Sequence, residues 1–363
     1  MKRIKKNKPV LVTGANGYIA SWIVKYLLQK NLTVHACVRG IKNKNKTQHL
    51  LDLTKNNKGK LFFFETNLLK EGSYDNAMIG CELVFHTASP FKMKTQNPKK
   101  DFIEPALKGT KNVLKSATKT KTVKRVVLTS SCAAMYADAI DTTKTPNKTL
   151  TEDVWNTKAT EKYQPYSYSK TIAEKEAWKI SKKQNKWDLV VINPSLVFGP
   201  SINPKNNTSG TMEILEMMTN GSMKIGAPKS GVGVVDVRDV ADAHIKAGFN
   251  PSAKGRYIAS AHNTDFLEIS RLLIPKYGNK IPLPKKAIPK WFLFLFGPIF
   301  DKVFSRRFVL NNVNIPFNAD NSKIKKELNI KFKPIKETME DSIESLIKSG
   351  LIKTKKQKNT YVR

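Results

Sequence analysis

Cysteine is scarce in this chain, and its spacing supports neither a disulfide framework nor a zinc site. The 363 residues contain three cysteines, Cys37, Cys81 and Cys132, with no Cys-x-x-Cys pair among them. Disulfide scaffolds and zinc modules carry more cysteines at closer spacing. Cys37 and Cys81 lie in or beside apolar segments, where a cysteine usually acts as a small core hydrophobe. We therefore expect no metal centre.

Long apolar runs are also missing. No stretch approaches the roughly 18 consecutive apolar residues that a transmembrane helix needs. The basic start, residues 1–8, leads into a glycine turn instead of the apolar region of a signal peptide. A cytoplasmic protein is the default interpretation.

Acidic residues are few: 29 Asp and Glu face 64 Lys and Arg, which gives a formal net charge of +35. Such a charge is typical of proteins that bind nucleic acid or anionic membranes. The lysines are spread along the whole chain, however, and no aromatic-laced basic patch stands out. We interpret the charge as a lysine-rich composition and do not expect nucleic-acid binding. A positive field would still help to capture an anionic dinucleotide.

The chain does contain a glycine turn near its start. Residues 10–12 form a short apolar run, Gly14 and Gly17 follow, and apolar residues then recur at helical spacing. In a dinucleotide site, Gly14 would allow the tight turn, Gly17 the approach of a pyrophosphate, and Ala20 close packing of helix on strand. The helix N-terminus would attract the phosphates. The alternative is an ordinary strand–helix turn that needs its glycines only for geometry.

Arg39 discriminates between the two nicotinamide dinucleotides. It ends a second predicted strand, residues 32–38, and no acid occurs between Val38 and His49. An acid about 20 residues after the glycines binds the ribose 2′-OH of NAD, whereas an Arg accommodates the 2′-phosphate of NADP. The sequence therefore predicts NADP. We assign Lys42 and Lys44 to a solvated basic loop.

Strands and helices alternate through the first two thirds of the chain. Further strands are predicted at residues 61–64, 83–86, 126–131, 189–192 and 232–240, and helices at 101–118, after 163, and at 212–218. This order predicts an α/β fold, a Rossmann-type doubly wound parallel sheet with ligands at the carboxyl ends of its strands. A polar stretch, residues 138–160, is predicted to be a surface loop.

Two domains are expected. We assign residues 8–200 and about 232–262 to an NADP-binding Rossmann domain, and about 201–231 and 263–350 to a smaller, mainly C-terminal substrate-binding domain. Residues 351–363 form a basic tail. The apolar segment 291–300, flanked by Lys and Arg, is too short to span a bilayer. A helix that lines the core or the substrate cleft is favoured over membrane contact.

Tyr166 and Lys170 form the most informative pair in the middle of the chain. Residues four apart share one face of a helix. The spacing alone says little, because Tyr26 and Lys30 match it. Tyr166 differs in beginning a helix after a Pro-containing turn, downstream of the serine-bearing strand end at Ser131. We interpret His86 as structural.

Together these motifs resemble the extended short-chain dehydrogenase/reductase superfamily, also called the NAD-dependent epimerase/dehydratase superfamily. Within it, the chain looks like the dihydroflavonol 4-reductase, cinnamyl-alcohol dehydrogenase and methylglyoxal reductase group. The motifs that carry the resemblance are residues 12–20, 38–39, 46–53, 72–75, 84–91, 129–131, 166–170, 193–195 and 318–323. It covers roughly residues 8–352.

The resemblance implies a role for each matching residue. Ser131, Tyr166 and Lys170 would be catalytic, and Ser131, Tyr136 and Tyr166 would contact the substrate. Asn67 stands where many relatives carry an Asp that contacts the adenine. The implied NADP-binding residues are Thr13, Gly14, Asn16, Gly17, Tyr18, Ile19, Arg39, Lys46, Asn67, Leu68, Thr87, Ala88, Ser89, Tyr166, Lys170, Pro194, Ser195 and Val197.

The chemistry of carbonyl reduction explains these residue types. A carbonyl that receives hydride develops negative charge on oxygen and needs a proton there, which Tyr166 would donate. A free Tyr has a pKa of about 10, and a neighbouring ammonium and the oxidised nicotinamide are expected to lower it. Ser131 would hold the carbonyl oxygen by a hydrogen bond. Lys170, by resemblance, would also bind the nicotinamide ribose.

Some positions depart from particular relatives. The Asn-Trp-Tyr-Cys-Tyr-Gly-Lys signature of cinnamoyl-CoA reductases is replaced by Gln-Pro-Tyr-Ser-Tyr-Ser-Lys at residues 164–170. This argues against reduction of an acyl-CoA. Tyr136 and Gly233 stand where plant dihydroflavonol reductases carry polar groups that contact the flavonoid, which argues against a flavonoid substrate.

Our first hypothesis is therefore an NADPH-dependent reductase of aldehydes or ketones, acting as a monomer or homodimer and reversible as an alcohol dehydrogenase. A nucleotide-sugar epimerase/dehydratase or a hydroxysteroid dehydrogenase would share the three catalytic residues. Arg39 argues against an epimerase, because such enzymes usually prefer NAD. A redox-sensing NADP-binding protein without catalysis is disfavoured by the intact Ser131, Tyr166 and Lys170.

Overall fold

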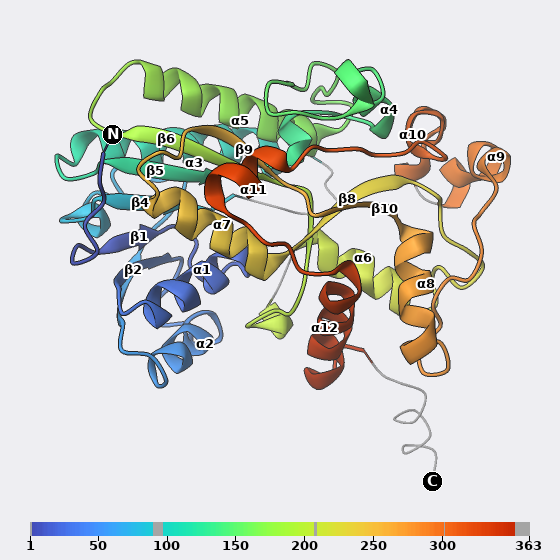
Figure 1. Cartoon of the computed structure of the whole chain (residues 1–363), viewed down its shortest axis with the longest axis horizontal. Coiled ribbons are helices and arrows are strands. Elements are labelled where there is room, and N and C mark those ends of the chain that lie inside the picture. Colours follow the sequence, from blue (N-terminus) through green and yellow to red (C-terminus); the bar gives the residue numbers. More distant parts are fainter. Residues whose placement is uncertain (1, 90–96, 207–208, 301, 353–363) are drawn as a thin grey trace, which may run out of the picture.

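A parallel sheet of seven strands organises the molecule (Figure 1). The computed structural model describes residues 2–89, 97–206, 209–300 and 302–352. The strand order is β3-β2-β1-β4-β5-β6-β9, so the order reverses between β1 and β4. The strands are β1 Val10–Val12, β2 Thr33–Val38, β3 Lys60–Glu65, β4 Leu83–His86, β5 Arg125–Thr129, β6 Asp188–Pro194 and β9 Gly255–Ala259. Ligands bind such sheets at the carboxyl ends of the strands beside the reversal.

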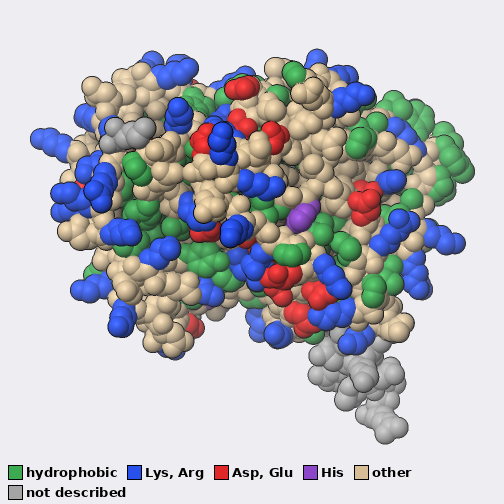
Figure 2. Space-filling model, in the orientation of Figure 1, with side chains coloured by type: hydrophobic (Ala, Val, Ile, Leu, Met, Phe, Trp, Pro, Cys, Tyr) green, Lys and Arg blue, Asp and Glu red, His purple; other side chains and the backbone are tan. Residues whose placement is uncertain are grey.

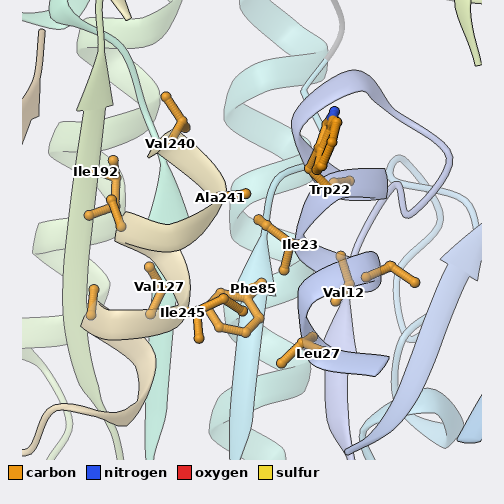
Figure 3. Packing of buried hydrophobic residues seen from close by; sticks show 14 of the residues in the cluster. Val12, Trp22, Ile23, Leu27, Phe85, Val127, Ile192, Val240, Ala241 and Ile245 are labelled. Carbon is orange, nitrogen blue, oxygen red and sulfur yellow. The ribbon is translucent and has the colours of Figure 1, made fainter. Parts of the chain in front are cut away.

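Helices cover both faces of this sheet, because its strands are apolar on both sides. Val12 packs under α1 (Tyr18–Gln29) and α7 (Val237–Phe249), as Figure 3 shows, whereas its neighbour Leu11 faces α3 (Glu104–Lys119) and α5 (Pro165–Lys182). Successive side chains of a strand point to opposite faces, which is why the two neighbours enter different cores. The predicted α/β fold with a doubly wound parallel sheet is confirmed.

A second, smaller sheet is formed by strands from the carboxyl-terminal half of the chain. Its order is β10-β8-β7, with β7 Leu196–Phe198, β8 Gly231–Asp236 and β10 His262–Asp265. A separate core joins it to α6, α8 and α12 (Figure 1). The remaining helices are α2 Lys44–Thr54, α4 Ala139–Thr142, α6 Gly210–Thr219, α8 Phe266–Tyr277, α9 Lys290–Phe300, α10 Arg306–Asn312, α11 Ser322–Leu328 and α12 Ile335–Lys348.

Two sequence predictions need correction. The strand predicted at residues 232–240 ends at Asp236, because the Asp236 carboxylate accepts a hydrogen bond from the Arg238 N–H and caps α7. The predicted surface loop at residues 138–160 contains α4 and is partly buried. Leu150 in this loop pairs with Ala319, and Asp138 is 2% exposed.

The apolar segment 291–300 also differs from expectation. It is helical, as α9, but only Leu293 and Gly297 are buried. Trp291, Ile299 and Phe300 are 63%, 78% and 74% exposed, so the favoured interpretation as a core-lining or cleft-lining helix is wrong for most of its side chains. Among the residues that the structure describes, no helix has the length and apolarity to cross a bilayer.

His244 of α7 connects this helix to the sheet without contact with solvent. Its Nδ1 lies 2.8 Å from the Val240 carbonyl oxygen and its Nε2 lies 2.6 Å from Thr129 Oγ1. A carbonyl only accepts, so we assign the ring proton to Nδ1, and Nε2 accepts the Thr129 hydroxyl. Burial lowers the pKa of His244 from 6.5 to about 4. The folded state therefore holds this ring neutral.

This buried ring predicts a specific loss of stability in acid. Between pH 6.5 and about 4 the unfolded chain protonates His244 and the folded chain does not. Stability should fall through this window as the pH drops, by at most about 1.4 kcal/mol per pH unit from this group. Denaturant unfolding at several pH values measures the slope. His244→Gln should flatten it, whereas His262→Gln, which removes a half-exposed histidine, should not; equal slopes in all three proteins would contradict the assignment.

Candidate active site

The glycine turn links β1 to α1 with its backbone close to the end of β4. Gly14 has a φ of +58°, and a Cβ there would lie 3.1 Å from the Cβ of Ala88. Gly17 caps α1 without a side-chain hydrogen bond, and its N–H donates to the Gly14 carbonyl at 2.8 Å. The first turn of α1 contains no acid. The turn therefore presents backbone and a positive helix end, which is the arrangement that binds a pyrophosphate.

Thr13 fastens this turn to β4. Its hydroxyl oxygen accepts from the N–H groups of Thr87 (3.1 Å) and Ala88 (3.0 Å) and lies 3.1 Å from His86 Nδ1. His86 is 2% exposed, and its pKa is lowered to about 3 by burial and then by the charge of Lys170. This supports the interpretation of His86 as a structural residue. The carboxyl end of β4 and the glycine turn thus form one surface, the floor of the candidate site, made of Thr13, Thr87, Ala88 and Ser89.

Arg39 and Lys46 lie together at the end of β2. Arg39 is exposed directly after the strand, and Lys46, in the first turn of α2, places its Nζ 3.5 Å from the Arg39 carbonyl oxygen. In the described part of the chain, no carboxylate forms an ion pair with Arg39. Two cations beside the glycine turn suit a phosphate group.

Asn67 and Leu68 follow β3 on the same edge. The Asn67 side-chain oxygen accepts the N–H of Leu69 at 2.9 Å, so it already has one donor. Leu68 is half-buried against Gly109, where a Cβ would come within 2.4 Å of the Leu68 Cγ. Tyr18, predicted with them, donates its hydroxyl to the Gly199 carbonyl at 2.7 Å, which leaves its backbone for a cofactor.

Tyr166 stands in the first turn of α5 and meets Ser131 across the site. Ser131 is the second residue after the end of β5, and its hydroxyl accepts the Ala133 N–H. Burial raises the pKa of Tyr166 to about 12, and the nearby Ser131 hydroxyl opposes this rise. The phenol therefore holds its proton at neutral pH. The sequence led us to expect a lowered pKa from Lys170 together with bound oxidised nicotinamide, and this stays a prediction for the complex with the cofactor.

Lys170 lies one helical turn beyond Tyr166 and is 8% exposed. Its Nζ is 5.9 Å from the centre of the Tyr166 ring. Burial lowers the pKa of Lys170 to about 8, and the negative charge of Glu174 opposes the shift. A cavity of about 20 Å³ lies behind the ammonium, between His86 and Glu174. It has room for about one water molecule.

Glu174 is a site residue that the sequence analysis missed. Its side chain is fully buried; it accepts from Ser130 Oγ at 2.5 Å and Asn193 Nδ2 at 2.8 Å, and lies 2.7 Å from Arg256 Nε in an ion pair. Asn193 Nδ2 also donates to the Ser131 carbonyl at 3.1 Å. The available signal was spacing, since Glu174 follows Lys170 by four residues on the same face of α5.

The ends of β6 and β7 form the opposite wall. Pro194 accepts from the Ser131 hydroxyl at 3.4 Å, and the Ser195 N–H donates to Ala259 at 3.1 Å. Val197 is 9% exposed. A Cβ at Gly233 would lie 2.9 Å from the Cβ of Ser195 and 2.4 Å from Ser260 Oγ. Close packing therefore explains the glycine at this position.

Tyr136 packs against Phe317 with ring centres 5.1 Å apart, beyond the 3-10 turn that follows Ser131. Asp138, two residues later, was also missed. It accepts from the Tyr163 hydroxyl at 2.8 Å, from Gln164 at 3.1 Å, and from Asn311 and Asn312 of α10 at 3.0 and 2.8 Å. Asp138 thus joins α10 to the residues just before Tyr166.

The structure brings most of the predicted residues to the carboxyl edge of the large sheet. Three groups result. The first group is the glycine turn with Arg39 and Lys46. The second combines the floor after β4 with the opposite wall after β6. The third, which we call the reactive group, consists of Ser131, Tyr166 and Lys170. Asn16 and Ile19 are half-buried within the glycine turn and α1. Tyr136 lies further from the turn, on the side of α10.

Known proteins resemble this chain over nearly its whole length. The NAD dependent epimerase/dehydratase family matches residues 10–258. Cinnamoyl-CoA reductase CAD2 of Medicago truncatula is 38% identical over 340 residues, which cover 93% of this chain and 95% of that protein. The structure of yeast methylglyoxal/isovaleraldehyde reductase Gre2 complexed with NADPH is 28% identical, with a TM-score of 0.73 over 95% of this chain and 100% of that chain. Vestitone reductase from alfalfa, Medicago sativa, has 25% identity and a TM-score of 0.70 over the same shares.

The Glu174–Arg256 ion pair leads to a stability prediction. Removal of one partner of a buried pair leaves the other charge uncompensated, at a cost of about 3–5 kcal/mol. Glu174→Ala should therefore lower the free energy of unfolding by this amount in denaturant titrations. Glu176→Ala is the matched control on the same helix, because Glu176 pairs with Lys111 at 3.5 Å near the surface. It should cost at most about 1 kcal/mol. A similar loss in both variants would contradict the role of Glu174.

Proposed function

The chain belongs to the NAD dependent epimerase/dehydratase family, and we propose that within this family it is an NADPH-dependent reductase that converts an aldehyde or ketone to an alcohol. The family resemblance seen in the sequence motifs is thereby confirmed. In terms of its broad class, the chain is an NAD(P)-dependent oxidoreductase of the group that contains cinnamoyl-CoA reductase, vestitone reductase and Gre2. The choice of NADPH, the reaction and the residue roles below are proposals.

One observation carries the proposal: Ser131 lies close enough to Tyr166 to act on its pKa, with the buried Lys170 one turn beyond, beside the glycine turn. A reductase needs a protonated acid where the carbonyl oxygen lies. Tyr166, with a pKa raised to about 12, keeps its proton until negative charge develops on the substrate. Ser131 would orient the carbonyl oxygen toward this proton.

Lys170 would stabilise the phenolate that Tyr166 becomes after it donates its proton. A pKa of about 8 keeps most of the Lys170 side chains charged at neutral pH. An ammonium near the ring favours the phenolate electrostatically. NADPH, when bound, would supply the hydride. The residues of the chain thus account for the proton, and the cofactor accounts for the hydride.

The residues at the end of β2 fit the 2′-phosphate of NADPH. Arg39 is exposed there without an ion-pair partner in the described ranges, and Lys46 lies beside it. No carboxylate stands where a ribose 2′-OH would need an acceptor. Two Gre2 structures, from Candida albicans and from yeast, were solved in complex with NADPH, which supports the same choice.

The proposed substrate is a small carbonyl compound. Yeast Gre2 is named for methylglyoxal and isovaleraldehyde. The relative named for cinnamoyl-CoA matches the chain as well, but residues 164–170 differ from the acyl-CoA signature. We propose that residues about 201–231 and 263–350 form the substrate-binding part. They include α6, α8 and most of the smaller sheet's β10.

A substrate screen tests the reaction. The purified protein is mixed with NADPH and a panel of aromatic aldehydes, methylglyoxal and α-ketoesters, and oxidation of the cofactor is followed by absorbance. At least one compound should be reduced. Tyr166→Phe should lose most of the turnover while it binds NADPH nearly as well, because only the proton donor is removed. Turnover near wild type in Tyr166→Phe, or no oxidation of bound NADPH by any compound, would count against the proposal.

A second experiment tests the choice of cofactor. Arg39→Asp should weaken NADPH binding by on the order of 10- to 100-fold, the loss expected for a hydrogen bond to a charged group. NADH binding should change little, because NADH has no 2′-phosphate. Titration of the intrinsic fluorescence measures both affinities. Lys42→Asp is the matched control, since it makes the same charge change on an exposed residue of the following loop. Equal losses for NADPH and NADH in Arg39→Asp would disprove the 2′-phosphate assignment.

A further inference from the structure

Helix α9 carries a patch of large apolar side chains on the outside of the molecule. The patch forms the green area at the right edge of Figure 2, where Figure 1 shows α9. Trp291, Ile299 and Phe300 are 63%, 78% and 74% exposed. Leu295, Phe296, Val303 and Leu310 are exposed as well, at 41–53%. We call these seven residues the aromatic patch. A contiguous apolar patch with a polar rim usually marks an interaction site.

The patch is presented by a packed structure. Leu293, Val309 and Val313 form a small buried cluster under α9 and α10. Gly297 lies so close to Phe304 that a Cβ would come within 2.9 Å of the Phe304 Cβ. The Lys290 ammonium donates to the Leu310 carbonyl at 3.0 Å and joins the two helices. The exposed side chains are therefore held in place by a local core of their own.

The rim of the patch is basic. Residues 285–307 contain six Lys and Arg and a single acid, Asp301. Lys285, Lys286, Arg306 and Arg307 are exposed. The Arg306 guanidinium of α10 lies 5.7 Å from the centre of the Phe294 ring of α9, the helix that carries most of the patch. Apolar and aromatic side chains thus share one surface with cations.

The basic rim decides which of two partners fits the aromatic patch, a second copy of the chain or an anionic membrane surface. A second copy of the chain would bring its own basic rim against this one, and the two would repel each other. An anionic surface would be attracted, and Trp and Phe beside Lys and Arg are typical of helices that lie in a bilayer interface. Eleven residues at 1.5 Å each give α9 a length of about 16 Å, about half of the hydrocarbon thickness. A helix of this length lies along a membrane.

We propose that the aromatic patch docks on an anionic lipid bilayer. Trp291, Ile299 and Phe300 enter the boundary between headgroups and acyl chains, and Lys285, Lys286 and Arg306 contact the lipid phosphates. Attachment is peripheral and reversible, because its strength comes from a few buried side chains and from surface electrostatics.

Vesicle binding tests the proposal with the whole chain. Cosedimentation with vesicles of phosphatidylserine and phosphatidylcholine is compared with phosphatidylcholine alone. We expect binding to the mixed vesicles. Ile299→Ser with Phe300→Ser should weaken it by at least about tenfold, because both side chains lose their apolar burial. The matched control is Ile79→Ser with Ile225→Ser, two side chains 66% and 90% exposed outside the patch. This control should bind like wild type.

The overall charge of +35 would attract any anionic vesicle, so the electrostatic part needs its own control. Lys285→Ala with Lys286→Ala should weaken binding about 30-fold, since each cation near the surface contributes about fivefold. Lys182→Ala with Lys183→Ala, at the C-terminal end of α5, changes the net charge equally and should have little effect. Equal losses in both pairs would overturn the proposal in favour of nonspecific attraction.

Trp291 gives a direct readout of docking. Among the described tryptophans it alone is largely exposed. Brominated lipids should quench part of the protein fluorescence, and Trp291→Phe should abolish the quenching without loss of vesicle binding. Quenching that persists in Trp291→Phe would overturn the proposed orientation. Sedimentation velocity without vesicles tests whether a second copy of the chain binds the patch. A dimer that dissociates in the double variant Ile299→Ser with Phe300→Ser would assign the patch to a second copy and overturn the proposal.

Discussion

The carboxylate of Glu174 is the buried charge on which the geometry of the reactive group depends. A charge inside a protein is tolerated only when it is paired and hydrogen-bonded. Glu174 meets this requirement with Ser130 after β5, Asn193 on β6 and Arg256 on β9. The Asn193 amide also donates to the Ser131 carbonyl. One carboxylate on α5 therefore fixes three strands relative to the helix that carries Tyr166 and Lys170.

The same carboxylate balances the charges of the site. Burial alone would favour a neutral Lys170, and Glu174 one turn away restores part of the preference for the ammonium. The buried His86 on the other side stays neutral, with its pKa lowered to about 3, so it adds no second cation. The result is one positive charge close to one protonated phenol. A phenol with a pKa of about 12 is a weak acid, and in the proposed reduction it would become effective when an oxyanion forms beside it.

The sequence predicted those features whose cause is local. Strands buried on both faces appear as apolar runs, and the glycine turn needs Gly14 and Gly17 wherever the chain continues, so both could be found without the structure. Glu174 could not be found in this way, because its partner Arg256 comes from a strand far along the sequence. The exposure of Trp291 was missed for a related reason. Apolar composition predicts a helix, but which face of it is covered depends on what packs there.

Asp138 connects the surface helices to the reactive group through a strained backbone. Gln164 adopts a left-handed φ of +54°, which costs on the order of 1 kcal/mol for a residue with a side chain. Its side chain donates to Asp138, and its carbonyl accepts the Tyr168 N–H at 3.0 Å. This conformation starts α5 at Pro165 and sets the position of Tyr166 on its first turn. Because Asn311 and Asn312 of α10 bind the same carboxylate, the start of α5 is fixed to the pair of helices, α9 and α10, that carries the aromatic patch. A displacement of α10 would therefore remove the contacts that hold Gln164 in its strained conformation.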